Sequence, residues 1–223
     1  MRTKRMEEKD LELLASYGLS ALPVQECRSV IYDPGETISR EGFEIADLYL
    51  VLSGRAKAWR LSGSGKSLIV SQYISHGMIG EIELMTGLQK ATTTTTAISE
   101  LACIAIPYDR CREELKHNIV FSNRLGQELA MKLANSADNF VSFALYPARQ
   151  RLCGYLLQNA DGDLFRGMMT EAAASIGMTY RHFSRLVHEL CEEGILQKEA
   201  GGYRLMDMEG LKRDARLERR EDT

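Results

Sequence analysis

Near the C-terminus, segment 170–196 has the residue pattern of two short helices joined by a tight turn. Thr170 and Thr179 each stand where a hydroxyl can cap the first free N–H groups of a helix. Gly177 stands at the turn, where a positive φ is needed and glycine adopts it without steric strain. The apolar residues that would pack the two helices together are Ala172, Ala173, Ile176, Met178, Phe183, Leu186 and Leu190. The pattern predicts a helix-turn-helix, with an ordinary helical hairpin as the alternative.

The second of these helices has a polar face that suits contact with DNA. Opposite its apolar residues it carries Tyr180, Arg181, Ser184, Arg185 and His188. A helix fits the major groove, and arginine reads guanine there through paired hydrogen bonds. We therefore expect base contacts from Tyr180, Arg181 and Arg185. Phosphate contacts, which set register more than sequence preference, are expected from Thr170, Thr179 and His182.

The residues after the second helix predict a small β-hairpin, or wing. Gly194–Leu196 and Tyr203–Leu205 flank a turn at Gly201–Gly202. The formal net charge of the chain is −3, and residues 146–223 hold 12 Lys and Arg against 13 Asp and Glu. A DNA-binding domain of this composition depends on a local cationic patch rather than on net charge. We expect that patch to consist of Arg181, Arg185, Lys198 and Arg204.

The bulk composition is that of a globular protein of a reducing compartment. The chain has 223 residues, 44% hydrophobic and 26% charged, which is enough for two modest domains. No apolar run approaches the roughly 20 residues of a membrane span. The charged segment 1–14 lacks the apolar stretch of a signal peptide. Five scattered cysteines form no CxxC pair, so we expect a cytoplasmic protein without membrane contact.

Short strands are expected between residues 27 and 108, after a short helix around Leu11–Leu14. Turn signals at 33–35 and 62–65 separate runs of apolar and β-branched residues. The expected strands are Arg28–Tyr32, Leu48–Leu52, Ala56–Leu61, Leu68–Ile74, Thr92–Thr96 and Ala97–Ile106. Many short strands at regular spacing favour a small barrel or roll over a βαβ sheet.

A long helix is predicted over Glu114–Tyr146. Leu125, Leu129 and Leu133 recur every four residues along it and form a narrow apolar stripe. No second long helix in the chain could cover this stripe, so a symmetric dimer is expected, with packing on the roll as the alternative. Pro147 follows as a hinge. Beyond it a further helix, Ala148–Ala160, is ended by Asp161–Asp163.

This layout resembles the bacterial CRP/FNR transcription regulators over nearly the whole chain. The matching pieces are Asp33–Glu36, Leu48–Gly54, Ile79–Glu81 and the helix-turn-helix. Gly80–Leu84, Asp161–Phe165 and Thr179–His182 look closest to the YeiL-type subgroup. The resemblance implies an α+β fold with a cyclic-nucleotide-binding-like β-roll that senses an effector, a long dimerisation helix and a winged helix-turn-helix. The implied limits are residues 1–110, 111–146 and 147–223, with rotation near 146–147 as the conformational lever.

The same resemblance implies a homodimer that reads a palindromic DNA site. Its half-sites would lie about one helical turn apart, because two recognition helices on a two-fold dimer require that spacing. RNA polymerase is a candidate partner, as is an unknown small-molecule effector. A small-molecule or partner-binding module without sequence-specific DNA binding is the alternative from another class. Operator binding that Arg185→Ala abolishes without unfolding would separate the two.

The effector site implied by the resemblance departs from the cyclic-nucleotide pattern. Gly80 and Glu81 would open the phosphate cassette, with Glu81 accepting from the ribose. The arginine expected to pair with the phosphate is replaced by Ala91, which Thr92 follows, while Ser136 keeps a hydroxyl for the base. A phosphate without its guanidinium lacks its main charge partner. We therefore expect an effector other than cyclic AMP, and a structural role for Gly80 and Glu81 as turn and cap. A one-residue slip that brings in Lys90 is the alternative.

Other sensor and catalytic chemistry has little support. An iron–sulfur site would need several N-terminal cysteines, and haem would need an axial ligand, for which His76 is a poor candidate because an exposed turn is expected there. A redox dithiol among Cys27, Cys103 and Cys111 is the alternative to inert buried thiols. Segment 63–67 resembles the end of a phosphate-binding loop but lies in a hairpin. Glu81 and Glu83 would share a strand face without a partner base. We assign no cofactor and expect no enzyme activity.

Overall fold

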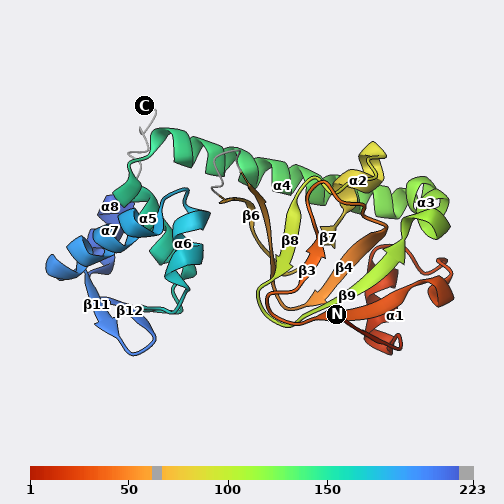
Figure 1. Ribbon diagram of the computed structural model, residues 1–223, viewed down its shortest axis with the longest axis horizontal. Coiled ribbons are helices and arrows are strands. Elements are labelled where there is room, and N and C mark those ends of the chain that lie inside the picture. Colours follow the sequence, from red (N-terminus) through yellow and green to blue (C-terminus); the bar gives the residue numbers. More distant parts are fainter. Residues whose placement is uncertain (62–66, 216–223) are drawn as a thin grey trace. The chain divides into compact units, whose positions relative to one another are not determined.

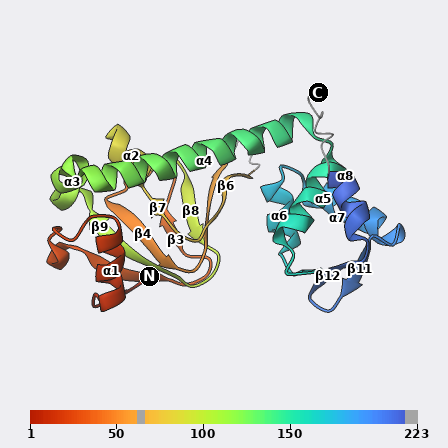
Figure 2. The same cartoon turned by 180° about the vertical axis from the view of Figure 1, so that it is seen from behind.

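The computed structural model describes residues 1–61 and 67–215, and all of their side chains except those of residues 61, 67–73 and 139. Two compact units, residues 1–136 and 137–223, make up the chain (Figures 1 and 2). The hairpin turn predicted at 62–65 lies outside the described residues, as does most of segment 63–67, which resembles the end of a phosphate-binding loop. Helix α4 runs from the first unit into the second.

The first unit is a roll of two antiparallel sheets. The sheet orders are β1-β2-β9-β4-β7 and β3-β8-β5-β6. Their strands are β1 (Arg2–Lys4), β2 (Arg28–Tyr32), β3 (Thr37–Ser39), β4 (Asp47–Ser53), β5 (Ala56–Leu61), β6 (Ser67–Ile74), β7 (Met78–Ile79), β8 (Thr94–Ala97) and β9 (Leu101–Pro107). The helices are α1 (Glu8–Ser16), a 3₁₀ turn at Val24–Glu26, α2 (Glu81–Thr86), α3 (Tyr108–His117) and α4 (Ile119–Leu145). The predicted roll is confirmed.

Alternation along β4 and β9 builds two cores, one on each side of the larger sheet. Cys103 and Ala105 of β9 lie in the cluster between the sheets, together with Ala56 and Ala58 of β5. Ile104 and Ile106 face the other way, into a cluster with α1, α3 and α4. Side chains on a strand alternate in this manner because successive Cβ atoms point to opposite faces. The roll thus presents a second apolar face on which helices pack.

Some elements of the roll differ from the prediction. The threonine run was expected to be strand throughout, but β8 begins only at Thr94. Strands β1, β3 and β7 were not predicted. Glu81 and Glu83 were expected on a strand and instead lie in α2, which follows Gly80 in a left-handed conformation with φ of +93°. The alternating pattern Glu-Ile-Glu-Leu is locally that of a strand, so periodicity gives no signal for the short helix α2.

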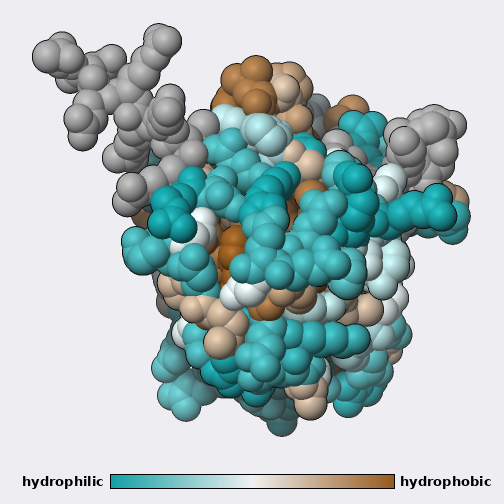
Figure 3. All heavy atoms as spheres, turned by 90° about the vertical axis from the view of Figure 1, so that its left-hand side faces the viewer, coloured by the Kyte–Doolittle hydropathy of each residue, from teal (hydrophilic) through white to brown (hydrophobic). Residues whose placement is uncertain are grey.

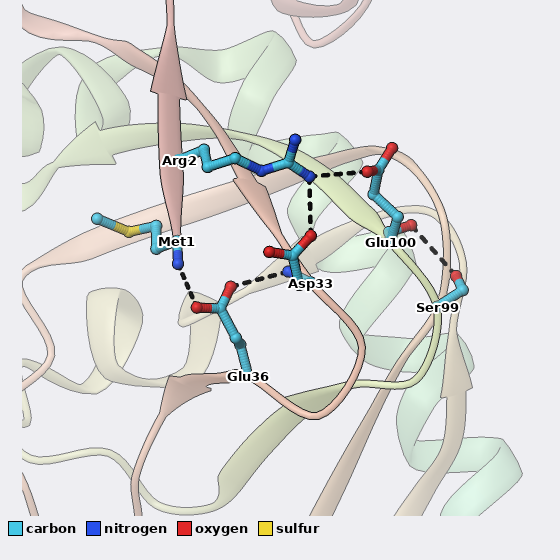
Figure 4. A network of polar contacts seen from close by, with 6 residues as sticks. All are labelled: Met1, Arg2, Asp33, Glu36, Ser99 and Glu100. Atoms are coloured by element: carbon cyan, nitrogen blue, oxygen red, sulfur yellow. Dashed lines mark hydrogen bonds and ion pairs between the residues drawn. The ribbon is translucent and has the colours of Figure 1, made fainter.

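Charged residues fasten β1 and the turn at 33–36 to the body of the roll (Figure 4). The guanidinium of Arg2 lies 2.8 Å from Asp33 Oδ1 and 2.8 Å from Glu100 Oε2. Glu36 accepts from the Met1 amino group and from the backbone N–H of Asp33. Because these groups are exposed, the contacts fix register more than they stabilise the fold.

Two glycines with the same backbone conformation provide a matched test of packing. Gly35 and Gly54 both have φ of +90°, but a Cβ at Gly54 would lie 2.0 Å from Glu100 O, whereas one at Gly35 would meet nothing within 4 Å. We expect Gly35→Ala to lower the free energy of unfolding by about 1 kcal/mol, the cost of the left-handed conformation. Gly54→Ala should cost about 3 kcal/mol or more, because backbone must also move. Urea unfolding measures both, and equal losses would contradict this explanation.

The predicted long helix is interrupted at Asn118, so it is two helices rather than one. Asn118 has an extended conformation, with φ of −84° and ψ of 108°. Its side chain accepts from the backbone N–H of Phe121 at 3.0 Å and donates to Gly18 O at 2.8 Å. An asparagine that caps a new helix in this way starts α4 in a different direction from α3.

The predicted leucine stripe is divided between core and solvent. Leu125 is 1% exposed and belongs to the core beneath the roll, and Leu129 packs against that core. Leu133 is 72% exposed. The predicted interface is therefore wrong for Leu125, which packs on the roll as the alternative held. Leu129 is half-buried against the same core, and Leu133 is the most exposed of the three.

The second unit is a winged helical domain around one core. Its elements are α5 (Ala148–Asn159), β10 (Leu164–Phe165), α6 (Met169–Ser175), α7 (Tyr180–Glu192), β11 (Leu196–Glu199), β12 (Gly202–Leu205) and α8 (Met208–Ala215). The predicted helices and the two-stranded wing are confirmed. The first strand of the wing is Leu196–Glu199 rather than Gly194–Leu196, and Gly202 lies in β12 rather than in the turn. Strand β10 was not predicted and joins the hairpin in the order β10-β12-β11.

The end of α4 packs within the second unit. A Cβ at Gly177, in the turn before α7, would lie 3.3 Å from the Phe143 ring. The Arg151 guanidinium lies over the same ring, 5.8 Å from its centroid, and donates to Phe143 O. Residues 137–145 therefore pack with the helix-turn-helix, and the second compact unit begins at residue 137, ten residues before the predicted limit at 147.

Candidate DNA-binding and effector sites

The helix-turn-helix is built as its residue pattern predicts, except at the first cap. Gly177 has φ of +64°, and Phe183, Leu186, Val187 and Leu190 of α7 are buried. Thr179 caps α7 by accepting from the backbone N–H of His182 at 3.3 Å. The predicted cap at Thr170 is wrong, because Met168 is the N-cap of α6 and makes no side-chain cap bond. Thr170 lies in the first turn of α6 and is exposed.

The polar side of α7 is open to solvent. Tyr180 is 53% exposed, and Arg181 and Arg185 are also exposed. Arg185 Nε lies 3.8 Å from Glu189 Oε1, a loose contact one turn away. Arg181 makes no hydrogen bond or ion pair with any residue that the structure describes. His182 and Ser184 are half-buried. The face of the molecule in Figure 3 is mainly hydrophilic, which agrees with a solvated surface.

Arg204 does not belong to the cationic patch that the sequence predicts. Its guanidinium pairs with Glu199 across the wing and with Asp163 before β10. The hydrogen bonds to these two carboxylates raise the pKa of Arg204. The side chain therefore ties the wing together, and the cationic residues left for a partner are Arg181, Arg185 and Lys198.

Gly80 is fixed in place by Tyr108. The Tyr108 hydroxyl donates to Gly80 O, and a Cβ on Gly80 would lie 2.4 Å from that hydroxyl oxygen. The left-handed conformation of Gly80 also favours glycine. The structural role expected for this residue agrees with these contacts.

Glu81 is buried and paired within the chain. It is 4% exposed, and Lys132 of α4 donates to its Oε1 at 2.6 Å. Lys132 also donates to Met78 O at 2.8 Å. The ammonium thus holds α4 to the roll through one carboxylate and one backbone carbonyl. Sequence reasoning missed this pair because 51 residues separate its members.

The other residues predicted to bind the effector are buried or form hydrogen bonds within the chain. Thr92 donates from its N–H and its hydroxyl to Glu83 Oε1, each at 2.7 Å. Ala91 is 3% exposed, whereas Lys90 next to it is exposed, so a one-residue slip that brings in Lys90 is wrong. Ser136 is exposed, and its hydroxyl donates to Lys132 O at 2.8 Å.

Removing the Lys132 ammonium should destabilise the first unit. Lys132→Met leaves the buried Glu81 carboxylate without its cation. Breaking a buried pair costs about 3–5 kcal/mol, and the lower end applies here because Lys132 is 30% exposed. The double variant Glu81→Leu/Lys132→Met should recover at least half of that loss, because no unpaired charge remains. Urea unfolding of the two variants tests the pair. A Lys132→Met protein as stable as the parent would show that the pair contributes nothing.

The cysteines do not form the three-membered cluster considered from the sequence. Cys27 and Cys111 lie in the core under the helices, and Cys103 lies between the sheets. Burial raises the pKa of the Cys27 and Cys103 thiols to about 12. Thiols that stay protonated at neutral pH are poor nucleophiles, so the inert reading is favoured. His76 is exposed, as expected for a turn residue.

Within residues 1–61 and 67–215, no group of three or more His, Cys, Asp or Glu is arranged to hold a metal ion. None of the helices in that part of the chain is both long and apolar enough to cross a membrane.

Comparison with known proteins identifies the family. Residues 29–118 match the sequence model of the cyclic nucleotide-binding domain, and residues 150–214 match that of the Crp-like helix-turn-helix domain. Together these matches span more than half of the chain, which belongs to the CRP/FNR family of transcription regulators. The family and the fold are those of regulators with a DNA-binding helix-turn-helix and are not those of enzymes.

Individual relatives are distant but extend along most of the chain. Regulatory protein YeiL of Escherichia coli O157:H7 is 26% identical, over 78% of this chain and 79% of its own length. A CRP-like cAMP-activated global transcriptional regulator of Mycobacterium tuberculosis is 22% identical, over 86% and 90%. Among solved structures, the c-di-GMP responsive global regulator CLP of Xanthomonas campestris has a TM-score of 0.77 at 15% identity, over 89% of this chain and 100% of its own. That likeness shows the shared fold.

The residues of this cassette do not fit a cyclic nucleotide. A bound phosphate needs a cation, and the position expected to supply it holds the buried Ala91. The predicted ribose acceptor, Glu81, is 4% exposed and accepts from Lys132 through Oε1. Burying the phosphate charge without a partner would be costly. The domain matches the cyclic nucleotide-binding model, but its cassette lacks the expected phosphate cation and its Glu81 is paired with Lys132.

Proposed function

We propose that this regulator acts as a homodimer that reads a pseudo-palindromic DNA site through the exposed face of α7. The observation that carries the proposal is the division of α7 into a buried apolar side and an open side bearing arginines. Such a helix can enter the major groove while its apolar side stays packed on the domain. Base contacts are assigned to Tyr180, Arg181 and Arg185, with Ser184 beside them. Thr170, Thr179 and His182 are assigned to phosphates.

The dimer interface is proposed along an exposed face of α4. Positions spaced alternately by three and four residues on this helix are all exposed, as in a coiled-coil seam. One set, spaced by seven, is Ile119, Gly126, Leu133 and Phe140. The other is Asn123, Ala130, Ala137 and Ala144. Leu133 and Phe140 are each 72% exposed, and the small residues between them allow close approach of a second helix. Leu133 is the one member of the predicted stripe that this interface keeps.

The remaining partners follow from family membership. RNA polymerase as a partner and the cytoplasm as location form part of the proposal, as do the functional limits 1–110, 111–146 and 147–223. Effector control is proposed to act through the β-roll with a ligand other than cyclic AMP. Such a ligand must bind the DNA-competent conformation of the protein more tightly than the inactive one. A ligand with equal affinity for both conformations does not change their populations.

Cyclic nucleotides are expected to leave this protein unchanged. A ligand present at about 100 times its dissociation constant would add about 2.7 kcal/mol of stability and shift the melting temperature by several degrees. Cyclic AMP and cyclic GMP should produce no such shift and should change DNA affinity less than about twofold, well under the effect of a coupled effector. Thermal unfolding and fluorescence anisotropy with labelled operator DNA measure the two quantities. A clear shift in melting temperature with either nucleotide would show that the cassette of Gly80 and Glu81 does bind a cyclic nucleotide. The DNA-binding proposal would remain intact.

A further inference from the structure

A cavity of about 560 Å³ lies on the roll, lined by Thr37, Arg40, Glu41, Phe43, Trp59 and Thr94. It opens on the outer face of the smaller sheet. Ala58 and Thr95 pair across β5 and β8 and are 7% and 2% exposed, facing the interior between the sheets. Trp59 and Thr94 are the next pair and face the opposite way, because side chains alternate along a strand. The cavity is therefore separate from the cassette of Gly80 and Glu81.

Two aromatic side chains form walls of this cavity, and hydrogen bonds fix the Trp59 ring and the Phe43 backbone. The indole Nε1 of Trp59 donates to Thr96 Oγ1 at 3.1 Å, which fixes the ring on the sheet. Phe43 is 56% exposed. Its backbone is anchored, since Phe43 O accepts from the N–H of Ala91 at 2.8 Å. The cavity thus offers flat apolar surface at little ordering cost.

The cavity also holds a cation with unused hydrogen-bond donors. The Arg40 guanidinium stacks on the Phe43 ring, 4.5 Å from its centroid, and pairs with no carboxylate among the described residues. The neighbouring Glu41 is occupied, because Arg60 donates to its Oε1 at 2.8 Å. A stacked guanidinium keeps its in-plane N–H groups free to bind a carboxylate through two parallel hydrogen bonds.

We propose that this cavity binds a small aromatic carboxylate, with the ring against Trp59 and Phe43 and the carboxylate on Arg40. The volume lies within the range of about 300–1,000 Å³ common for small-molecule sites. The loop of Gly42 and Phe43 is hydrogen-bonded to Ala91, and Thr92 is bonded to Glu83 of α2. These hydrogen bonds connect the wall of the cavity to the cassette of Gly80 and Glu81 through the neighbouring residues Ala91 and Thr92. The proposal does not depend on DNA binding, because ligand binding to the cavity is measured without DNA.

The chain itself supplies the reporter for a binding test. Trp59 is its single tryptophan, so intrinsic fluorescence reports directly on the cavity wall. The full chain is titrated with benzoate and phenylacetate, and with benzyl alcohol and acetate as probes that lack the charge or the ring. We expect a saturable change with the two aromatic carboxylates. Affinity should be at least tenfold weaker for benzyl alcohol, which loses the charge-assisted hydrogen bond, and for acetate, which loses the aromatic contact.

Variants then test the assigned residues. Arg40→Gln should weaken benzoate binding at least tenfold, and Phe43→Ala should weaken it as well, because one aromatic wall is lost. Arg5→Gln, an exposed arginine of the same unit outside the cavity, should bind as the parent does. The proposal is overturned if no saturable change occurs with either carboxylate, if benzyl alcohol binds as well as benzoate, or if Arg40→Gln binds like Arg5→Gln.

Discussion

Arg185→Ala is expected to lower the affinity for operator DNA about 100-fold while leaving the fold intact. A paired contact from arginine to guanine contributes about 1–3 kcal/mol, and a dimer loses two such contacts. The side chain is exposed, and its contact within the chain is a loose one with Glu189. Such a contact contributes little to stability. The loss should therefore appear in specific binding and not in unfolding.

The measurement is anisotropy of labelled operator and of unrelated DNA at the same salt concentration, since affinity depends steeply on salt. Arg213→Ala is the matched control, because Arg213 is equally exposed on α8 and pairs only loosely with Asp207 at 3.7 Å. It should bind operator like the parent. An equal loss on operator and unrelated DNA would reassign Arg185 to a phosphate, and an unchanged affinity would refute the proposed groove contact.

Leu133→Asp is expected to separate the dimer and to abolish operator binding at concentrations where the parent binds. Leu133 is 72% exposed, so the new carboxylate costs nothing in the monomer but faces its symmetry mate at a seam. Burying two unpaired carboxylates there would be prohibitive. Sedimentation velocity should report a monomer, while urea unfolding of the roll should be nearly unchanged.

Leu125→Ala supplies the contrasting control on the same helix. Leu125 is 1% exposed in the core of the roll, so its truncation should cost about 2–5 kcal/mol of stability and leave the dimer assembled. If Leu133→Asp remains a dimer, or if Leu125→Ala rather than Leu133→Asp dissociates it, the interface proposed on α4 is wrong.

The leucine stripe shows how far periodicity alone can be trusted. Each step of four residues turns about 40° beyond one full turn of a helix. Leu125, Leu129 and Leu133 therefore drift around α4 by about 80° in total. The first faces the roll and the last faces solvent. The seam proposed on α4 follows alternating steps of three and four residues. Such steps keep the side chains on one face of the helix.

Local chemistry made the helix-turn-helix and the strands predictable. Gly177, the Thr179 cap and the apolar face of α7 are all set by residues a few positions apart. The pairs Lys132–Glu81 and Arg204–Asp163 join residues 51 and 41 positions apart, and no local pattern reports them. Thr170 was misassigned because a threonine can stand within the first turn of a helix as well as at its cap. Asn118 carried a usable signal, since asparagine is a strong N-cap residue.

Selection of genomic DNA fragments by the purified full chain, without added ligand and at about physiological salt, tests sequence-specific binding most directly. We expect enrichment of one pseudo-palindromic motif whose half-sites are centred about one helical turn apart. The same selection with Arg185→Ala should lose the motif. A selection that returns no motif, both with the purified protein and after cell extract is added to supply an effector, would contradict the account.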